Sequence, residues 1–483
     1  MRARIGVYAG PCRGNCEIRM RGALLVKKTV TALLIMVLLL GLIPSALAAK
    51  GEVVVHLSSN RDVQGARVIV SSYDDTGRFV SCDVKTIGLT AGDNSIPVTQ
   101  PKDGAYYKAY FLDGDCRPIA DSVDSRRIAP AKPKPYNFRY VRKTALTAEE
   151  QEFYDKLATG LLAHEESTPD LNPEIDIKKM NTALLQDYPE IFWYIGQYRS
   201  STKLINGEPV SMTLQPVYII SKEECERLQA KVDAWETQCL SGLSQTASDY
   251  EKALYIYQYI VAHSDYGNNA EHLANQDSQI LAYNSIVHIM VDGYGICGDY
   301  AKTAQYLLNR QGIDCAYIIG QSKRAGHAWN LMWPDGVPTW IDATWGDPVL
   351  PDGKKNDAPN YAYFGITTAD LTRNHIIDSA VPVPDCTSEA YNYFRRNGLY
   401  VETYREDAVK EAMVHALAIN ENRINLRFSD EAWQEACDQL LTEGRFYPIL
   451  REAMEQCGIQ TQWTSYRYLT DDDFCYLSVE RAE

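Results

Sequence analysis

Three side chains that could act together, a thiol, an imidazole and a carboxylate, follow one another in the second half of the 483-residue sequence. The thiol is Cys297, in "GYGICGDYAKTAQYLLNRQG". Ala301, Ala304 and Leu307 follow it at the spacing of an amphipathic helix that begins at the cysteine. A thiol at a helix N-terminus faces the positive end of the helix dipole, which favours the nucleophilic thiolate. Position alone leaves open a structural cysteine in a tight turn.

A predicted hairpin brings the imidazole and the carboxylate together. The runs "GHAWNLMW" (326–333) and "PTWIDATW" (338–345) are rich in β-branched and aromatic residues, and the "WPDG" between them has the composition of a type I turn. A hairpin closed there places His327 opposite Asp342, or diagonal to it if a bulge shifts the register by one residue. An imidazole beside a carboxylate is held in one tautomer and can accept a proton from a thiol.

A nucleophile, a base and an orienting acid are the groups that thiol acyl transfer requires. The blocks "GYGICGDYA", "GHAWN" and "WIDATWGDP" resemble, in this order and spacing, three motifs of the bacterial transglutaminase-like superfamily. This papain-like group includes transglutaminases, peptidases and peptide N-glycanases. The resemblance covers about 250–378. It implies an α/β core with Cys297 as the nucleophile, His327 as the general base and Asp342 as the orienting acid.

The resemblance also implies an oxyanion hole. The backbone N–H of Cys297 would supply one donor. Tyr283, in "QILAYNSIVHIM", stands where relatives often place a second donor, although a tyrosine there can simply pack. Asp299 departs from the pattern, because many relatives have glycine at this position. Its carboxylate would oppose thiolate formation if it faced Cys297, and would complement the helix dipole if it did not.

No cofactor or metal is expected. A site made of Cys297, Cys315 and His327 is conceivable, but no CxxC or HxxxH spacing supports it. His375, in "LTRNHIID", matches a histidine that often closes this kind of domain, and its interpretation is structural.

The order of patterns along the chain predicts an α+β protein of several domains. Short alternating apolar runs indicate an N-terminal β-sandwich, a Pro-rich stretch indicates a stiff linker, and long periodic runs indicate a helical lead-in to the core. The predicted divisions are a signal peptide (1–48), the β-sandwich (49–128), the linker (129–144), a transglutaminase-like domain with a helical N-terminal part (145–388, core 250–378) and a small α+β domain (389–483).

The N-terminus resembles a targeting segment. Cations precede an apolar run at 32–43, and Ala46-Leu47-Ala48 follows it, as in a secretory signal peptide. An uncleaved anchor is the alternative, although the run is short for a membrane-spanning helix. Met20 is a second candidate start. We therefore expect an exported protein, secreted or at the cell surface.

Export bears on the cysteines, because disulfides persist in oxidising compartments. Cys82 and Cys116 flank part of one β-rich region and could pair. Cys225 and Cys239 could close a loop around a helix. If Cys297 is a free nucleophile, an odd number of cysteines remains after signal cleavage, so at least one more is unpaired or intermolecular.

The charge limits the partners. The formal charge is −15, and it becomes −21 without residues 1–48, which carry seven cations and one anion. Nucleic acid is therefore not an expected partner, and a membrane is expected only through an uncleaved signal segment. The sequence predicts an exported thiol enzyme that hydrolyses or cross-links peptide or side-chain amides, with cell-wall peptides among the candidate substrates. The alternative is a non-catalytic cell-surface binding or assembly module with the same fold.

Overall fold

The chain divides into two compact units in the computed structural model. One unit comprises residues 1–14, 133–236 and 249–483, and the other comprises 15–132 and 237–248. No helix among the described residues has the length and apolar character needed to cross a membrane. The structure describes residues 4–9, 52–59, 63–73, 79–90, 92–99, 106–112, 118–124 and 133–482, the last range without 245, 268–283, 323–324, 348–358, 379–380, 421 and 460–462.

The N-terminal region contains two antiparallel sheets. In the two-stranded sheet β2 (Glu52–Ser59) pairs with β5 (Gly92–Thr99). The four-stranded sheet has the order β4-β3-β6-β7, and Ala66, Val68 and Val70 of β3 are buried at the two-residue period of a strand. The four predicted strand runs are confirmed, and β4 and β7 add to them, whereas the sandwich arrangement stays a prediction. The bounds are Val63–Tyr73 (β3), Phe79–Leu89 (β4), Tyr106–Leu112 (β6) and Pro118–Asp124 (β7).

The stretch 145–265, predicted to be largely helical, contains a long β-hairpin as well as helices. Strands β9 (Tyr194–Ile205) and β10 (Glu208–Tyr218) are joined by Asn206-Gly207, whose φ angles are 53° and 88°. Two consecutive residues with positive φ form the tight turn that a twisted hairpin needs. The prediction was wrong here. The short strand β8 (Thr168–Leu171) extends the same sheet.

The helices of this stretch begin where their capping groups are. Thr147 and Glu150 form a reciprocal capping box at the start of α2. The buried carboxylate of Asp187 accepts the backbone N–H groups of Val141 and Arg142 in the first turn of α1. The helices are α1 (Tyr140–Ala145), α2 (Ala148–Leu162), α3 (Ile177–Asp187), α4 (Lys222–Ser241) and α5 (Asp249–Ala262).

The cysteine pair predicted for this region does not form. Cys225 and Cys239 both lie on α4. Fourteen residues at about 1.5 Å each separate their Cα atoms by about 21 Å, three times the reach of a disulfide. Cys82 is a free, exposed cysteine, so its predicted pairing with Cys116, which lies outside the described residues, is not formed either.

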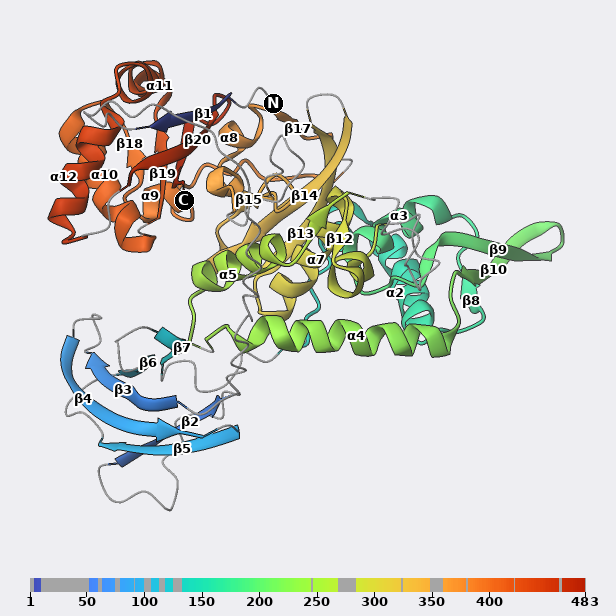
Figure 1. The fold of residues 1–483 in the computed structure, drawn as a ribbon. Helices are drawn as coiled ribbons and strands as arrows, with labels where there is room; N and C mark the ends of the chain where they lie inside the picture. Colours follow the sequence, from blue (N-terminus) through green and yellow to red (C-terminus); the bar gives the residue numbers. More distant parts are fainter. Residues whose placement is uncertain are drawn as a thin grey trace, which may run out of the picture. The chain divides into compact units, whose positions relative to one another are not determined.

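The core of the larger unit is one helix on an antiparallel sheet of order β16-β15-β14-β13-β17. Helix α7 (Cys297–Arg310) packs across β13 and β14 (Figure 1). The buried amide of Asn330 on β14 donates to the carbonyl of Ala301 on α7 and fixes the helix on the sheet. The strands are β13 (Asp314–Ser322), β14 (Ala325–Trp333), β15 (Thr339–Ile341), β16 (Phe364–Ile366) and β17 (His375–Ile376).

The C-terminal region is mixed α and β, as its sequence predicts, and its helices include the short α9 (Tyr393–Arg396). Its sheet has the order β1-β20-β21-β19-β18, and β1 (Arg4–Ala9) pairs with β20; the rest of the predicted signal segment lies outside the described residues. The buried ion pair of Arg427 with Asp370 ties this region to the core. The elements are β18 (Tyr400–Val401), α10 (Glu406–Ile419), β19 (Arg423–Phe428), α11 (Asp430–Cys437), α12 (Phe446–Gln456), β20 (Ser465–Asp471) and β21 (Tyr476–Arg481).

Candidate active site

Cys297 is the first residue of α7, as the sequence predicts, and it is partly buried. The preceding residue, Ile296, is extended, and its N–H donates to Asp299 Oδ2 at 2.7 Å. Gly298 allows a close approach, because a Cβ there would lie 2.2–2.5 Å from the side-chain amide atoms of Asn284. The helix start and the segment around Asn284 therefore meet next to the thiol.

Asp299 holds this junction together. Its carboxylate is 2% exposed. Besides the N–H of Ile296, it accepts the N–H of Ser285 at 2.6 Å and Nδ1–H of His288 at 2.9 Å. Of the two alternatives for Asp299, the structure favours the one in which its charge complements the helix start, since three donors surround it.

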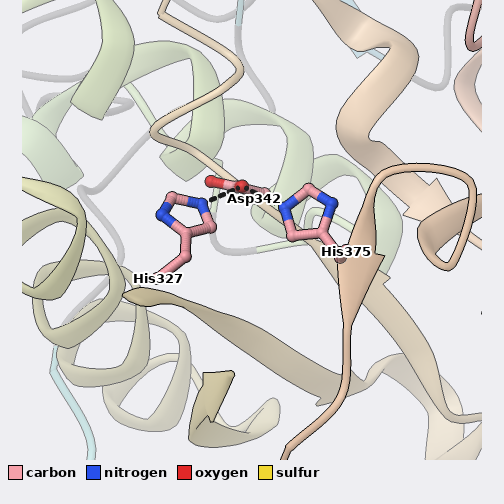
Figure 2. A group of neighbouring side chains, drawn as sticks. All are labelled: His327, Asp342 and His375. Atoms are coloured by element: carbon pink, nitrogen blue, oxygen red, sulfur yellow. Dashed lines mark hydrogen bonds and ion pairs between the residues drawn. The ribbon is translucent and has the colours of Figure 1, made fainter. Parts of the chain in front are cut away.

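The hairpin places His327 on β14 and Asp342 just after β15. His327 Nε2–H donates to Asp342 Oδ2 at 2.7 Å (Figure 2). The predicted contact is present, but the predicted register was wrong: Asn330 pairs with Ile341, so the ladder is shifted by two residues. The turn is a tight two-residue type I′ turn centred on Asp335 and Gly336, which both have positive φ, at 49° and 78°, and the N–H of Val337 donates to the carbonyl of Pro334 at 3.0 Å.

The carboxylate of Asp342 is 1% exposed and has a donor for each of its lone pairs. Oδ1 accepts the backbone N–H groups of Thr344 at 2.9 Å and Trp345 at 3.1 Å. Oδ2 lies between two imidazoles, His327 at 2.7 Å and His375 at 3.1 Å (Figure 2). A buried carboxylate held in this way is fixed in position and stays ionised.

The electrostatics of the pair favour a charged imidazole. Burial alone would lower the pKa of His327, but the charge and hydrogen bond of Asp342, and an interaction with the Cys297 side chain, raise it to about 10. Burial would raise the pKa of Asp342, yet His327 and then His375 hold it well below its ordinary value. Because Nε2 of His327 is bound to Asp342, Nδ1 is left for the thiol.

His375, which the sequence analysis interpreted only as structural, is part of the site. It lies on β17, which pairs with β13 through Ser322. Its Nε2 lies 3.1 Å from Asp342 Oδ2, and its Nδ1 lies 2.6 Å from the side-chain oxygen of Asn374. The motif "LTRNHIID" was the available signal, but a two-residue strand gives no pattern that would orient the side chain.

Ligand atoms of His327, Asp342 and His375 all lie within 4.8 Å of one another, which is close enough for a metal ion. The hydrogen bonds between them account for the same arrangement without one. Cys315, the other cysteine of the conceivable metal site, lies on β13 with its thiol fully buried and its backbone bound to the Asn309 amide.

Aromatic rings surround the imidazoles. The Trp329 ring stacks 5.8 Å from His327, and the Trp345 ring lies 5.8 Å from His327 and 4.8 Å from His375. These walls exclude water from the pair, and the lower local dielectric strengthens its charge interactions. Tyr283, the predicted second oxyanion donor, lies outside the described residues. Its neighbour Asn284 is described, with its amide over Gly298.

Comparisons with known proteins agree with this geometry. The model of the transglutaminase-like superfamily matches residues 238–344, which include Cys297, His327 and Asp342. The predicted superfamily is thus confirmed for a domain in this part of the chain, and the structure there is mixed α and β. The match supports the general prediction of a thiol-dependent enzyme.

Similar solved structures are distant. One is described as a TGase, with 18% identity over 30% of this chain, a TM-score of 0.22 and a match that spans 44% of that protein's length. A candidate cysteine protease from Cytophaga hutchinsonii (11% identity, TM-score 0.18) aligns with 64% of this chain and 81% of its own length. A candidate protease from Parabacteroides distasonis (10% identity, TM-score 0.19) aligns with 64% of this chain and 64% of its own length. No curated protein matches the chain.

Proposed function

We propose that the chain is a thiol-dependent acyl-transfer enzyme that cleaves peptide or side-chain amides, with Cys297 as the nucleophile. The observation that carries this proposal is the contact of one imidazole, His327, with Cys297 on one side and with the fixed carboxylate of Asp342 on the other. A purely structural cysteine has no need of such a pair. A nucleophile, a base and an orienting acid in contact are what covalent acyl transfer uses.

The proposed reaction follows from these positions. The Cys297 thiol gives its proton to His327, and the sulfur forms a bond to the amide carbon, so that the carbonyl oxygen becomes an oxyanion. The imidazolium then returns the proton to the nitrogen as the C–N bond breaks, which leaves a thioester and a free amine. Water, deprotonated by His327, attacks the thioester and releases the acid and the thiol.

The oxyanion would be stabilised by the N–H of Cys297 and by a side chain from the segment 283–284. Tyr283 remains the proposed second donor from the family resemblance. Asn284 is a second candidate, because its amide lies against Gly298, beside the thiol. The variants Tyr283→Phe and Asn284→Ala distinguish the two candidates. Replacement of the true donor should lower kcat by about 10²- to 10³-fold.

We propose hydrolysis rather than cross-linking. Export of the protein and a cell-wall peptide substrate are further proposals, which rest on the sequence. A primary amine in place of water would give transamidation through the same thioester. The runner-up is a non-catalytic surface module, which would keep the fold and leave the thiol inert.

Alkylation by iodoacetamide at a series of pH values, mapped by mass spectrometry, tests the proposal. The exposed thiols of Cys82 and Cys457 serve as internal standards in the same molecule. We expect Cys297 to label much faster than both at pH 6, and the His327→Ala variant to lose this excess. Equal rates at the three cysteines, in folded protein, would leave the surface-module function as the better explanation.

A further inference from the structure

A cavity of about 260 Å³ lies near the start of α7, the helix that begins at Cys297. Asn284 and Ser285 form part of its lining, and Asn284 also lies against Gly298. Tyr317 of β13 lines it as well. Burial and then the charge of Cys297 raise the pKa of this tyrosine. Through Asn284 the cavity reaches Gly298, the residue that follows the thiol.

The walls of the cavity are mostly apolar, with one cation among them. Leu185 of α3, Phe192 and Ile319 are among the apolar residues, and Lys302 of α7 is the cation. Lys302 is 7% exposed. Within the part of the chain that the structure describes, its ammonium has no hydrogen bond or ion pair, which is rare for a lysine buried this deeply.

The two carboxylates whose charges act on Lys302 already have other hydrogen-bond donors. Glu190 accepts Arg139 Nη2–H at 2.9 Å and the Tyr136 hydroxyl at 2.8 Å. Asp299 is bound by the three donors at the helix start. Burial lowers the pKa of Lys302 to about 8, while Asp299 and then Glu190 act to raise it. The side chain is therefore still mainly charged at pH 7.

We propose that this cavity is a substrate subsite for a carboxylate on an apolar stem, with Lys302 as the cationic partner. This proposal rests on the proposed function, because it assigns the neighbouring group of the amide that Cys297 attacks. An ammonium in an apolar cavity binds a carboxylate strongly, since water does not compete for either charge. The carboxylate comes from a peptide C-terminus or from an acidic side chain.

Binding of two matched ligands tests the subsite without catalysis. The full chain carrying Cys297→Ala is titrated by calorimetry with 4-phenylbutanoate and with the neutral 4-phenylbutanamide. We expect the acid to bind about ten- to a hundred-fold more tightly than the amide. Lys302→Met should abolish this preference. Lys252→Met, which removes a lysine paired with Asp249 away from the cavity, should preserve it.

Equal binding of acid and amide, no binding of either, or a preference that survives Lys302→Met would each overturn the subsite. Circular dichroism shows whether Lys302→Met is folded. If it is not, Thr182→Glu supplies the test, because Thr182 lines the cavity and is exposed. A carboxylate there should weaken binding of the acid and leave the amide unchanged, and equal weakening of both would count against the proposal.

Two peptides then distinguish the sources of the carboxylate. Acetyl-Ala-Phe carries its one carboxylate at the C-terminus, and acetyl-Glu-Phe-amide carries its one carboxylate on a side chain. The peptide that binds more tightly shows which kind of carboxylate the cavity takes. Iodoacetamide labelling of Cys297 in the wild-type chain keeps the two proposals apart. A reactive thiol without a carboxylate preference contradicts the subsite alone. A carboxylate preference with an inert thiol contradicts the proposed function alone.

Discussion

Among the described residues, two buried carboxylates near Cys297 bind histidines: Asp342 binds His327 and His375, and Asp299 binds His288. The His327–Asp342 and His288–Asp299 pairs differ in what they orient. In the first, His327 is bound to Asp342 and its other nitrogen is left for the thiol. In the second, His288 donates to Asp299 at 2.9 Å, and the same carboxylate also binds the backbone at the helix start. A buried histidine–aspartate pair thus has no fixed meaning. The role of such a pair depends on which other groups the imidazole and the carboxylate contact.

The largest difference between the pairs should appear when each imidazole is removed. His327→Gln should lower turnover of a cleavable peptide by about 10⁴-fold, because neither the proton acceptor nor the later donor remains. His288→Gln should lower it less than ten-fold, since it removes one of three donors to Asp299. Steady-state kinetics on both variants give the comparison. Similar losses in the two would mean that the pairs are equivalent.

Replacing the carboxylate of the first pair should change the pH dependence as well as the rate. In wild-type protein, activity should fall as the pH rises towards 10, because His327 loses the proton that it gives to the leaving amine. Asp342→Asn removes the main group that raises this pKa. The basic limb should then move down to pH 6.5 or below, with a loss of about 10³- to 10⁴-fold at the optimum.

The same pair makes stability depend on pH. The folded-state pKa of His327 lies above its ordinary value of 6.5, so its contribution is complete below pH 6.5 and is lost as the pH rises towards 10. The pKa of Asp342 is depressed, so its contribution is present above its ordinary value of 3.8 and is lost in acid. Urea unfolding across pH 5 to 10 should show the loss at high pH in wild-type protein and not in Asp342→Asn.

The second pair should be sensitive in stability rather than in chemistry. In Asp299→Asn an amide NH₂ group faces one of the three donors, which should lower the free energy of unfolding by about 2–3 kcal/mol. Turnover should fall mainly through displacement of the Asn284 segment. A matched Asp→Asn change at the exposed Asp407, which pairs with Arg405, should cost almost nothing. Denaturant titrations of the two variants check this, and an unchanged midpoint for Asp299→Asn would show that the junction is not fixed by this carboxylate.

Within the first pair's surroundings, a smaller effect than at His327 or Asp342 is expected at His375. His375→Gln keeps a hydrogen-bonding side chain beside Asp342 but loses the aromatic contact with Trp345 at 4.8 Å. One hydrogen bond to a charged group corresponds to about ten-fold in rate. We expect a kcat lower by that factor with an unchanged KM, and a basic limb shifted by less than in Asp342→Asn. A loss as large as that of His327→Gln would place His375 in the proton transfer itself.

Local patterns predicted the helix that begins at Cys297, the strands β14 and β15 of the core sheet and the contact of His327 with Asp342. They were wrong about the register of the hairpin. The sequence "WPDG" was interpreted as a type I turn centred on Pro334 and Asp335, whereas the structure has a type I′ turn centred on Asp335 and Gly336, which shifts the ladder by two residues. The contact survives because side chains two positions apart lie on the same face of a strand pair.

The other features that the sequence analysis did not predict are the β9–β10 hairpin, the contact of His375 and the burial of Lys302. Asn206-Gly207 was a readable hairpin signal, but periodic helices on both sides of it dominated the interpretation of the whole stretch. His375 reaches Asp342 only through a two-residue strand on β13, and Lys302 becomes a buried cation only when α3 and the residues after it cover α7. Such placements come from assembly, which no single window of sequence contains.

The aromatic wall around the imidazoles gives the site an optical property. The rings of Trp345 and Trp329 both lie 5.8 Å from His327, and a protonated imidazole quenches the emission of an indole beside it. Tryptophan fluorescence should therefore rise as His327 loses its proton, and the rise should be smaller in Trp345→Phe and absent when Trp329 is replaced as well. The molecule thus carries its own reporter of proton transfer, which can be read before any substrate is known.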